Sequence, residues 1–167
     1  MKIPWIRQDW QEWIKSFRFF TPIQVRFGDT DQLGHINNVS YFSYFEHGRL
    51  AYLEELGLIG SLLDTSETSD SVIVSANMEC HYLRQVYYGE KVILGVRISR
   101  IGRSSADFEY ALLTGENKEL SAAGRGAIVY IDRHTGKSKP LPEKIKNIIC
   151  SYEQAAAPAD KEFISGK

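Results

Sequence analysis

Four runs of alternating apolar and polar residues, at 72–83, 91–101, 104–113 and 119–131, most constrain what this chain can fold into. Alternation with a period of two is typical of strands that bury one face. The connections between the runs are short, so consecutive strands are expected to pair antiparallel. In the first run we expect a single face to carry Val72, Val74, Ala76, Met78, Cys80 and Tyr82. The pattern predicts a four-strand antiparallel meander.

The segment ahead of these runs has helical periodicity instead. Apolar residues recur at helical spacing between 38 and 56, Asn37 can cap the start, and Gly57 can close the end. Gly48 lies inside this segment and costs about 1 kcal/mol relative to alanine. We therefore expect Gly48 to lie against a packed neighbour such as a sheet.

Three shorter elements complete the expected order. An alternating run at 23–27 predicts a strand, and Pro142 can open a short C-terminal helix. Residues 9–18 have the pattern of an amphipathic helix that Asp9 can cap. We expect this helix to pack on the domain or across a subunit contact, with a lid or a membrane-surface anchor as the alternative.

These elements predict an α+β fold in which a curled antiparallel sheet of about five strands wraps one long helix. We divide the chain into an N-terminal helical extension at 1–20, a single domain at 21–153 and a flexible tail at 154–167. Two such sheets joined edge to edge would give a deeper pocket than one, so we expect a homodimer or a homotetramer.

Composition excludes several classes of function. The chain has 20 Lys and Arg against 21 Asp and Glu, without the basic excess typical of nucleic-acid binding. Cys80 and Cys150 have no zinc-ligand spacing, so no metal or other cofactor is implied. The sequence contains no apolar stretch of the ~20 residues that a membrane span needs, and residues 1–9 do not read as an export signal. We expect a cytoplasmic protein.

Residues 26–49 carry the pattern most informative about chemistry. Asp29, Asp31 and Gly34 form an Asp-x-Asp-x-x-Gly sequence, and Tyr41 follows near the expected helix start. This pattern resembles the hotdog-fold thioesterases of the 4-hydroxybenzoyl-CoA thioesterase type, and the order of elements over 21–135 is similar. The resemblance implies a hotdog fold and hydrolysis of acyl-CoA or similar thioesters.

The same segment also resembles the histidine-containing motif of plant acyl-ACP thioesterases. In that motif an aspartate, an asparagine and a histidine lie at alternating positions, which correspond here to Asp31, Leu33 and His35. Leucine has no side-chain amide, so this chain departs from the acyl-ACP catalytic arrangement.

Asp31 is the candidate catalytic carboxylate. Thioester hydrolysis needs a carboxylate that attacks the carbonyl or takes a proton from water, and donors for the developing oxyanion. The first amides of a helix lack partners within it and lie at its positive end. By the resemblance, the Asn38 amide is the oxyanion donor. The alternative for Asp31 is a turn aspartate that binds its own backbone.

The neighbouring polar residues have competing interpretations. His35 can orient Asp31, help to activate water, or bind the loop backbone. We interpret Asp29 as a loop-stabilising residue and Asn37 as a helix cap. Other hotdog enzymes carry their acid on the central helix, but Glu46 has Arg49 three residues on and is interpreted as its ion-pair partner.

The segment 100–105 resembles the family's coenzyme-binding turn. Arg100, Arg103 and Ser104 are therefore the candidate contacts for coenzyme A phosphates, with Arg84 and Arg125 as weaker candidates. Tyr41 is a candidate substrate contact. The implied function is a thioesterase that acts on acyl-CoA or a carrier-protein thioester. The alternatives are a non-catalytic acyl-thioester sensor and, less favoured, a hotdog dehydratase.

Overall fold

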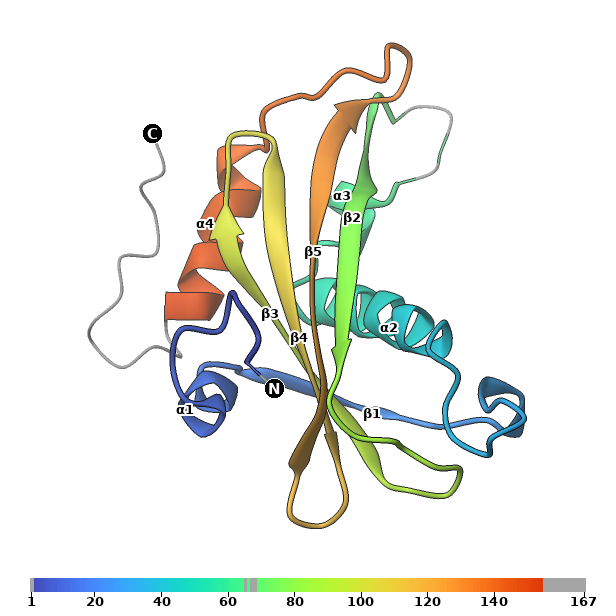
Figure 1. Cartoon of the computed structure of the whole chain (residues 1–167). Helices are drawn as coiled ribbons and strands as arrows, with labels where there is room; N and C mark the ends of the chain where they lie inside the picture. Colours follow the sequence, from blue (N-terminus) through green and yellow to red (C-terminus); the bar gives the residue numbers. More distant parts are fainter. Residues whose placement is uncertain (1, 65, 67–68, 155–167) are drawn as a thin grey trace.

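A five-stranded antiparallel sheet, curled around a long helix, forms the frame of the structure (Figure 1). The computed structural model describes residues 2–64, 66 and 69–154. The strands lie in the order β1-β3-β4-β5-β2. Their bounds are Phe19–Ile23 for β1, Ser71–Tyr82 for β2, Val92–Ile101 for β3, Ser105–Thr114 for β4 and Glu119–Asp132 for β5. The predicted α+β architecture of about five strands is confirmed. The predicted four-strand meander is wrong, because only β3, β4 and β5 pair in sequence, whereas β2 pairs with β5 and not with β3.

The long helix α2, Ser40–Glu55, crosses one face of the sheet. The Val39 N–H donates to Asn37 Oδ1 at 3.0 Å just ahead of it. At the other end Gly57 adopts a positive φ of 66°, a conformation that glycine enters at little steric cost. Gly57 is therefore confirmed as the closing residue, whereas the N-cap of α2 is Val39 and the Asn37 side chain binds its N–H just ahead of the helix.

Close contact between α2 and the sheet depends on Gly48. A Cβ at this position would overlap the Leu94 side chain and lie 2.9 Å from Val96 Cγ2, both on β3. The glycine thus lets the helix backbone rest on the strand, as the sequence predicts. Phe45, one turn earlier, stacks on Tyr110 of β4 with ring centroids 4.6 Å apart. The core lies between these two layers.

The C-terminal helix α4, Glu143–Gln154, packs beside α2 and contacts β3. Ile145 and Ile149 enter the core. β1 pairs with β3 only as far as Val96. Beyond that point Glu153 Oε1 accepts the Ile98 N–H at 2.9 Å. A side chain of α4 therefore satisfies a backbone group that β1 leaves unpaired.

The N-terminal segment packs on the opposite face of the sheet. Helix α1, Trp10–Lys15, is capped by Asp9, whose Oδ1 accepts the Gln11 N–H at 2.8 Å. A second apolar cluster lies beneath it, composed of Ile3, Trp13, Phe17, Ala111, Leu113 and Ala123. The expectation that this helix packs on the domain is confirmed.

The strand predicted at 23–27 is wrong. β1 occupies Phe19–Ile23, and Phe27–Asp29 form a short 3-10 helix instead. Pro22 lies inside β1, where its missing N–H is tolerated because β1 is an edge strand. The alternation after Ile23 has no partner strand, since Ile23 already pairs with Val92 at the start of β3.

The single buried face predicted for β2 is also wrong. A bulge between Ser75 and Asn77 shifts the register against β5. Before it, Ile73 is buried while Val74 is 39% exposed; after it, Met78 and Cys80 pack against the core. The extra residue turns the odd positions inward first and the even positions afterwards.

Two short elements connect or follow the main ones. Helix α3, Ile59–Leu62, follows α2 and is absent from the sequence prediction. Apart from Gln154, the predicted tail 154–167 lies outside the described residues. Within the part of the chain that is described, no helix is long and apolar enough to cross a membrane.

Candidate functional site

The loop between β1 and α2 folds as a tight turn around Asp31. The Asp31 N–H donates to the His35 carbonyl and the Gly34 N–H donates to the Asp31 carbonyl, each at 3.0 Å. Gly34 has a φ of 82°, which favours glycine at this position. These hydrogen bonds fix the backbone of the turn at Asp31.

The two carboxylate oxygens of Asp31 have different surroundings. Oδ1 accepts the Leu33 N–H at 2.8 Å, so the turn-aspartate interpretation describes this oxygen. Oδ2 lies 3.4 Å from Nδ1 of His35, which is also 3.3 Å from the Ile36 carbonyl oxygen. One oxygen therefore holds the turn, and the other remains beside the imidazole.

Asn38 stands where the loop enters α2. The Ser40 N–H donates to the Asn37 carbonyl at 2.9 Å, which places the Asn37–Asn38 peptide at the helix start. Asn38 is exposed, and its own N–H donates no hydrogen bond to any described residue. A backbone N–H at a helix start can donate a hydrogen bond to a carbonyl oxygen or an anion.

A cavity of about 410 Å³ brings together four of the predicted site residues. Asp31, His35, Asn38 and Tyr41 all line it. Its wall is completed by Ile36, Tyr82, Leu83, Arg84 and Gln85. Asp31 is the one acidic residue among these lining residues. The chemistry of the cavity is therefore that of one carboxylate near an unused backbone donor.

Two tyrosines of the cavity stay protonated at neutral pH. Burial raises the pKa of the Tyr41 hydroxyl to about 12, and burial likewise raises the pKa of Tyr82 to about 12. Their rings meet edge to face with centroids 5.0 Å apart. Both hydroxyls are therefore hydrogen-bond donors in the cavity wall and not bases.

The connection between β2 and β3, residues 83–91, forms the other side of the cavity. It is joined to the Asp31 loop by the Ile36 N–H, which donates to the Val86 carbonyl at 2.7 Å. Tyr82, the last residue of β2, donates its hydroxyl to the Asn38 carbonyl at 2.9 Å. Tyr82 is not among the site residues predicted from sequence, because no local spacing signals a contact between residues 44 positions apart.

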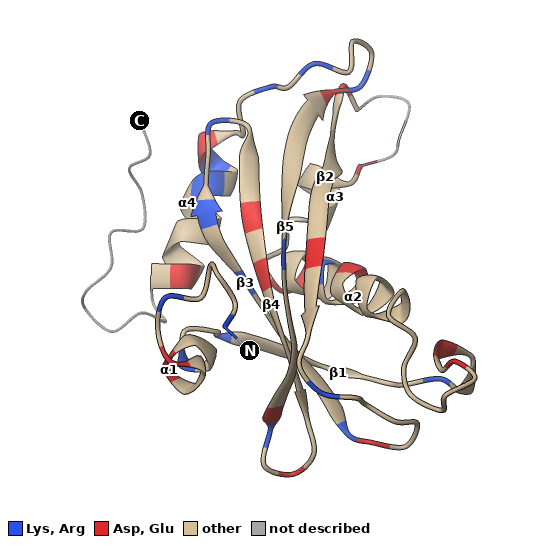
Figure 2. Ribbon diagram, in the orientation of Figure 1, with Lys and Arg blue, Asp and Glu red and all other residues tan. Residues whose placement is uncertain are grey.

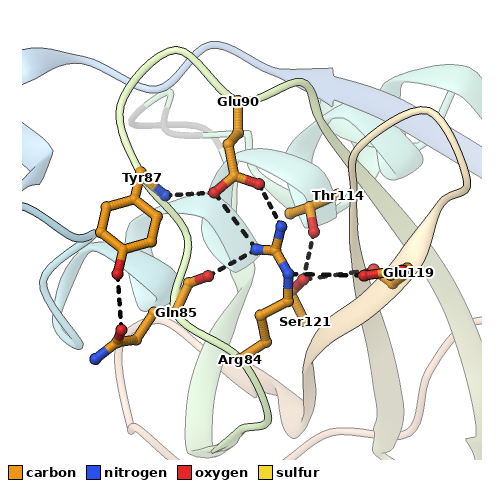
Figure 3. Close-up of polar contacts among 7 residues, drawn as sticks. All are labelled: Arg84, Gln85, Tyr87, Glu90, Thr114, Glu119 and Ser121. Atoms are coloured by element: carbon orange, nitrogen blue, oxygen red, sulfur yellow. Dashed lines mark hydrogen bonds and ion pairs between the residues drawn. The ribbon is translucent and has the colours of Figure 1, made fainter.

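Arg84 is the centre of a polar cluster within this connection (Figure 3). Its Nη2 lies 2.6 Å from Glu90 Oε2, and Nη1 donates to the Gln85 carbonyl at 2.6 Å. Nε lies 3.7 Å from Glu119. Glu90 also accepts the Tyr87 N–H at 2.8 Å. Two carboxylates therefore surround the guanidinium that the sequence suggested as a weaker coenzyme contact.

The candidate coenzyme-binding turn lies at the other end of the sheet. Residues 102–104 join β3 to β4 at the end opposite the 83–91 connection (Figure 1). A ten-residue strand spans about 30 Å, so Arg103 and Ser104 lie far from Asp31 within one chain. Arg100 pairs with Asp107 at 2.8 Å. Neither Arg103 nor Ser104 lines the Asp31 cavity.

The remaining sequence candidates have structural partners. Asp29 Oδ2 accepts the Arg26 N–H and the Tyr44 hydroxyl, each at 2.8 Å. Glu46 lies 3.8 Å from Arg49 and is 66% exposed. These contacts confirm the interpretations of Asp29 and Glu46.

Charged residues occur along the strands β2, β4 and β5 (Figure 2). Arg125 pairs there with Glu79 at 2.9 Å, and its guanidinium lies over the Trp5 ring. Arg125 lies in a second cavity, on the outer sheet face, which Asp31 does not line. No group of three His, Cys, Asp or Glu side chains is placed to hold a metal among the residues described.

The fold is the hotdog fold, and comparison with known proteins places the chain in the class of thioester hydrolases that have this fold. The family model of the Thioesterase-like superfamily matches residues 25–149. The chain belongs to this superfamily and is a thioester hydrolase. The predicted hotdog fold is thereby confirmed.

Individual relatives are similar over most of the chain. The Bacillus subtilis protein YsmA, described as uncharacterized, is 38% identical over 152 residues, which cover 89% of this chain and 97% of YsmA. A Thermus thermophilus thioesterase solved with coenzyme A and Zn is 34% identical, with a TM-score of 0.69, over 83% of this chain and 97% of that one. The chloroplastic acyl-acyl carrier protein thioesterase ATL3 of Arabidopsis thaliana is 26% identical, over 75% of this chain and 64% of ATL3.

Proposed function

We propose that this protein hydrolyses acyl-CoA thioesters with Asp31 as nucleophile or general base and the Asn38 N–H as oxyanion donor. The observation that supports the proposal is that both groups line one cavity, in which Asp31 is the acidic residue and the Asn38 N–H has no described partner. The coenzyme A bound to the Thermus thermophilus relative supports the choice of acyl-CoA.

As a general base, Asp31 takes a proton from water, and the resulting hydroxide attacks the thioester carbonyl. The oxyanion binds the Asn38 N–H until the C–S bond breaks, and the departing thiolate takes the proton from Asp31. As a nucleophile, the carboxylate attacks the carbonyl directly and expels the thiolate. Water then hydrolyses the mixed anhydride, which restores the carboxylate and releases a proton that the thiolate takes up. Both routes yield one acid and one thiol.

Two neighbours assist this chemistry in the proposal. His35 lies beside the free oxygen of Asp31, where it orients the carboxylate and the attacking water. Tyr41 is buried at the cavity wall and contacts the acyl group. The acyl group itself is left open, because aromatic side chains suit arylacyl and fatty-acyl chains alike.

The proposal includes a homodimer formed through β2. In the described chain, β2 lies at the edge of the sheet and pairs only with β5. Antiparallel pairing of two β2 edges would continue the sheet and cover both exposed edges. It would also bring the β3–β4 turn of one subunit to the end of the sheet that holds the Asp31 cavity of the other. Arg100, Arg103 and Ser104 could then bind the coenzyme phosphates.

A carrier-protein thioester is the second candidate substrate, favoured by the likeness to the Arabidopsis acyl carrier protein thioesterase. Thiol release should be measured for the unmodified protein with an acyl-CoA series of varied chain length, an arylacyl-CoA and the matching acyl carrier protein thioesters. Turnover of acyl-CoA supports the proposal. Turnover of carrier thioesters alone would move the substrate to that class, and tight acyl-CoA binding without release would establish the sensor function instead.

A further inference from the structure

The Tyr82 hydroxyl reaches the one backbone segment on which the proposed oxyanion donor depends. It donates to the Asn38 carbonyl at 2.9 Å, although Tyr82 belongs to β2 and Asn38 to the entry of α2. Tyr82 also lines the cavity with Asp31. This hydrogen bond therefore crosses from one wall of the cavity to the other.

Hydrogen bonds fix the peptide groups on both sides of the Asn38 Cα. On the N-terminal side, the Asn37 carbonyl accepts the Ser40 N–H at 2.9 Å. On the C-terminal side, the Asn38 carbonyl accepts the Tyr82 hydroxyl, and the Val39 N–H of the same peptide donates to the Asn37 side chain. The Asn38 N–H lies in the first of these planes, and only φ and ψ of Asn38 join that plane to the second. Holding the second plane therefore restricts how the first plane, with its N–H, can turn.

The position of Tyr82 is itself fixed by its surroundings. Its ring packs edge to face on Tyr41, which is 3% exposed. Two residues beyond Tyr82, the Arg84 backbone N–H donates to the Ser121 carbonyl at 3.2 Å, and its guanidinium binds Glu90 (Figure 3). Two carboxylates surround this guanidinium, so its charge is already paired. Its role is to stabilise the 83–91 connection rather than to bind an anionic ligand.

We propose that Tyr82 is a positioning residue, whose hydroxyl orients the Asn38 peptide and thereby aims the Asn38 N–H at the thioester carbonyl. This inference rests on the proposed function, which makes that N–H the oxyanion donor. A donor held in place acts mainly on the transition state, because the negative charge develops only there. Loss of the Tyr82 hydroxyl should therefore lower kcat and leave KM almost unchanged.

The test is Tyr82→Phe, which keeps the ring and removes only the donor. We expect kcat for acyl-CoA to fall about tenfold, with KM altered by less than about twofold. Tyr88→Phe is the matched control, because it removes a hydroxyl from the exposed part of the same connection. The carbonyl ¹³C resonance of Asn38 gives a readout independent of activity, and it should move upfield only in Tyr82→Phe.

Asp31→Asn, measured in parallel, separates the inference from the function on which it rests. An inactive Asp31→Asn with an unchanged kcat in Tyr82→Phe would overturn the positioning role alone. A raised KM with unchanged kcat would also overturn it, because Tyr82 would then contact the substrate instead. If Asp31→Asn stays active, the proposed function is wrong. The Asn38 resonance then decides the inference, and an unchanged resonance overturns it.

Discussion

The Tyr52 hydroxyl donates to Glu153 Oε1 at 2.5 Å, in the layer between α2 and α4. Glu153 is 5% exposed, and burial raises its pKa above the ordinary value of 4.5. The folded protein therefore binds the proton of the Glu153 carboxyl more tightly than the unfolded chain does. The contribution of the Glu153 carboxyl to the free energy of unfolding is fully present below pH 4.5. It is lost as pH rises through the pKa of this carboxyl in the folded protein.

Glu153→Gln keeps an oxygen acceptor for Tyr52 and Ile98 but cannot titrate. The free energy of unfolding of the wild type, minus that of Glu153→Gln, should therefore fall as pH rises from 4.5. Urea unfolding of both proteins across a pH series measures this difference, and the comparison cancels the titration of other groups. A difference that stays constant or grows with pH would show that burial does not raise the pKa of this carboxyl.

Gly48→Ala should destabilise the protein although alanine is the better helix former. The new Cβ would overlap the Leu94 side chain, which is fully buried on β3. Overpacking of this kind costs about 1–3 kcal/mol. Toward the upper end of this range the cost exceeds the gain in helix propensity, which is about 1 kcal/mol. Gly60→Ala in α3 is the matched control, because nothing lies within 4 Å of its Cβ position. Equal stability of the two variants in denaturant unfolding would contradict close contact between α2 and the sheet.

Arg84 and Glu90 should be energetically coupled. Their side chains are 37% and 23% exposed and meet at 2.6 Å. In a double-mutant cycle with Arg84→Gln and Glu90→Gln, we expect a coupling of about 1 kcal/mol in the free energy of unfolding. The Lys91 and Glu116 pair, with side chains 76% and 80% exposed, is the control and should show a much weaker coupling, because solvent screens it. Equal coupling energies for the two pairs would show that the ion pair between Arg84 and Glu90 does not stabilise the 83–91 connection.

Arg103→Ala should weaken binding of the coenzyme without slowing the chemistry. We expect the KM for acyl-CoA to rise about tenfold at constant kcat, because one charge-assisted contact to phosphate is lost. The thioester of the same acyl group with N-acetylcysteamine has no phosphate, so its hydrolysis should be unchanged. An unchanged KM for acyl-CoA would exclude the β3–β4 turn as the phosphate site.

The fold could be predicted where its signals are local. The runs at 72–131 became strands within one or two residues of the expected bounds, since alternation is a local signal. Their pairing was predicted only for β3, β4 and β5, because the 83–91 connection leads from β2 at the far edge of the sheet to β3 and does not make them neighbours. β1 was misplaced because an alternating run does not reveal where its partner strand begins, and Ile23 already pairs with the first residue of β3. The bulge near Ala76 was missed because it changes which face is buried without breaking the alternation.

The candidate site likewise has one part that the sequence predicts and one part that it does not. Asp31, His35, Asn38 and Tyr41 lie within eleven residues of sequence, and one loop and one helix start bring them to a single cavity. The wall that faces them comes from β2 and the 83–91 connection. Tyr82 could not be assigned there from sequence, because its contact with Asn38 depends on the tertiary fold.

The most direct test of the central claim is the rate of acyl-CoA hydrolysis by Asp31→Asn. Asparagine keeps the Oδ1 acceptor for the Leu33 N–H, so the loop should remain folded while the carboxylate is lost. Asp132→Asn is the matched control, because Asp132 Oδ1 accepts the His134 and Thr135 N–H groups in a turn at the other end of the sheet. We predict that kcat falls on the order of a thousandfold in Asp31→Asn and stays at the wild-type value in Asp132→Asn. A rate for Asp31→Asn within about threefold of the wild type, from a folded protein, would contradict a catalytic role for Asp31.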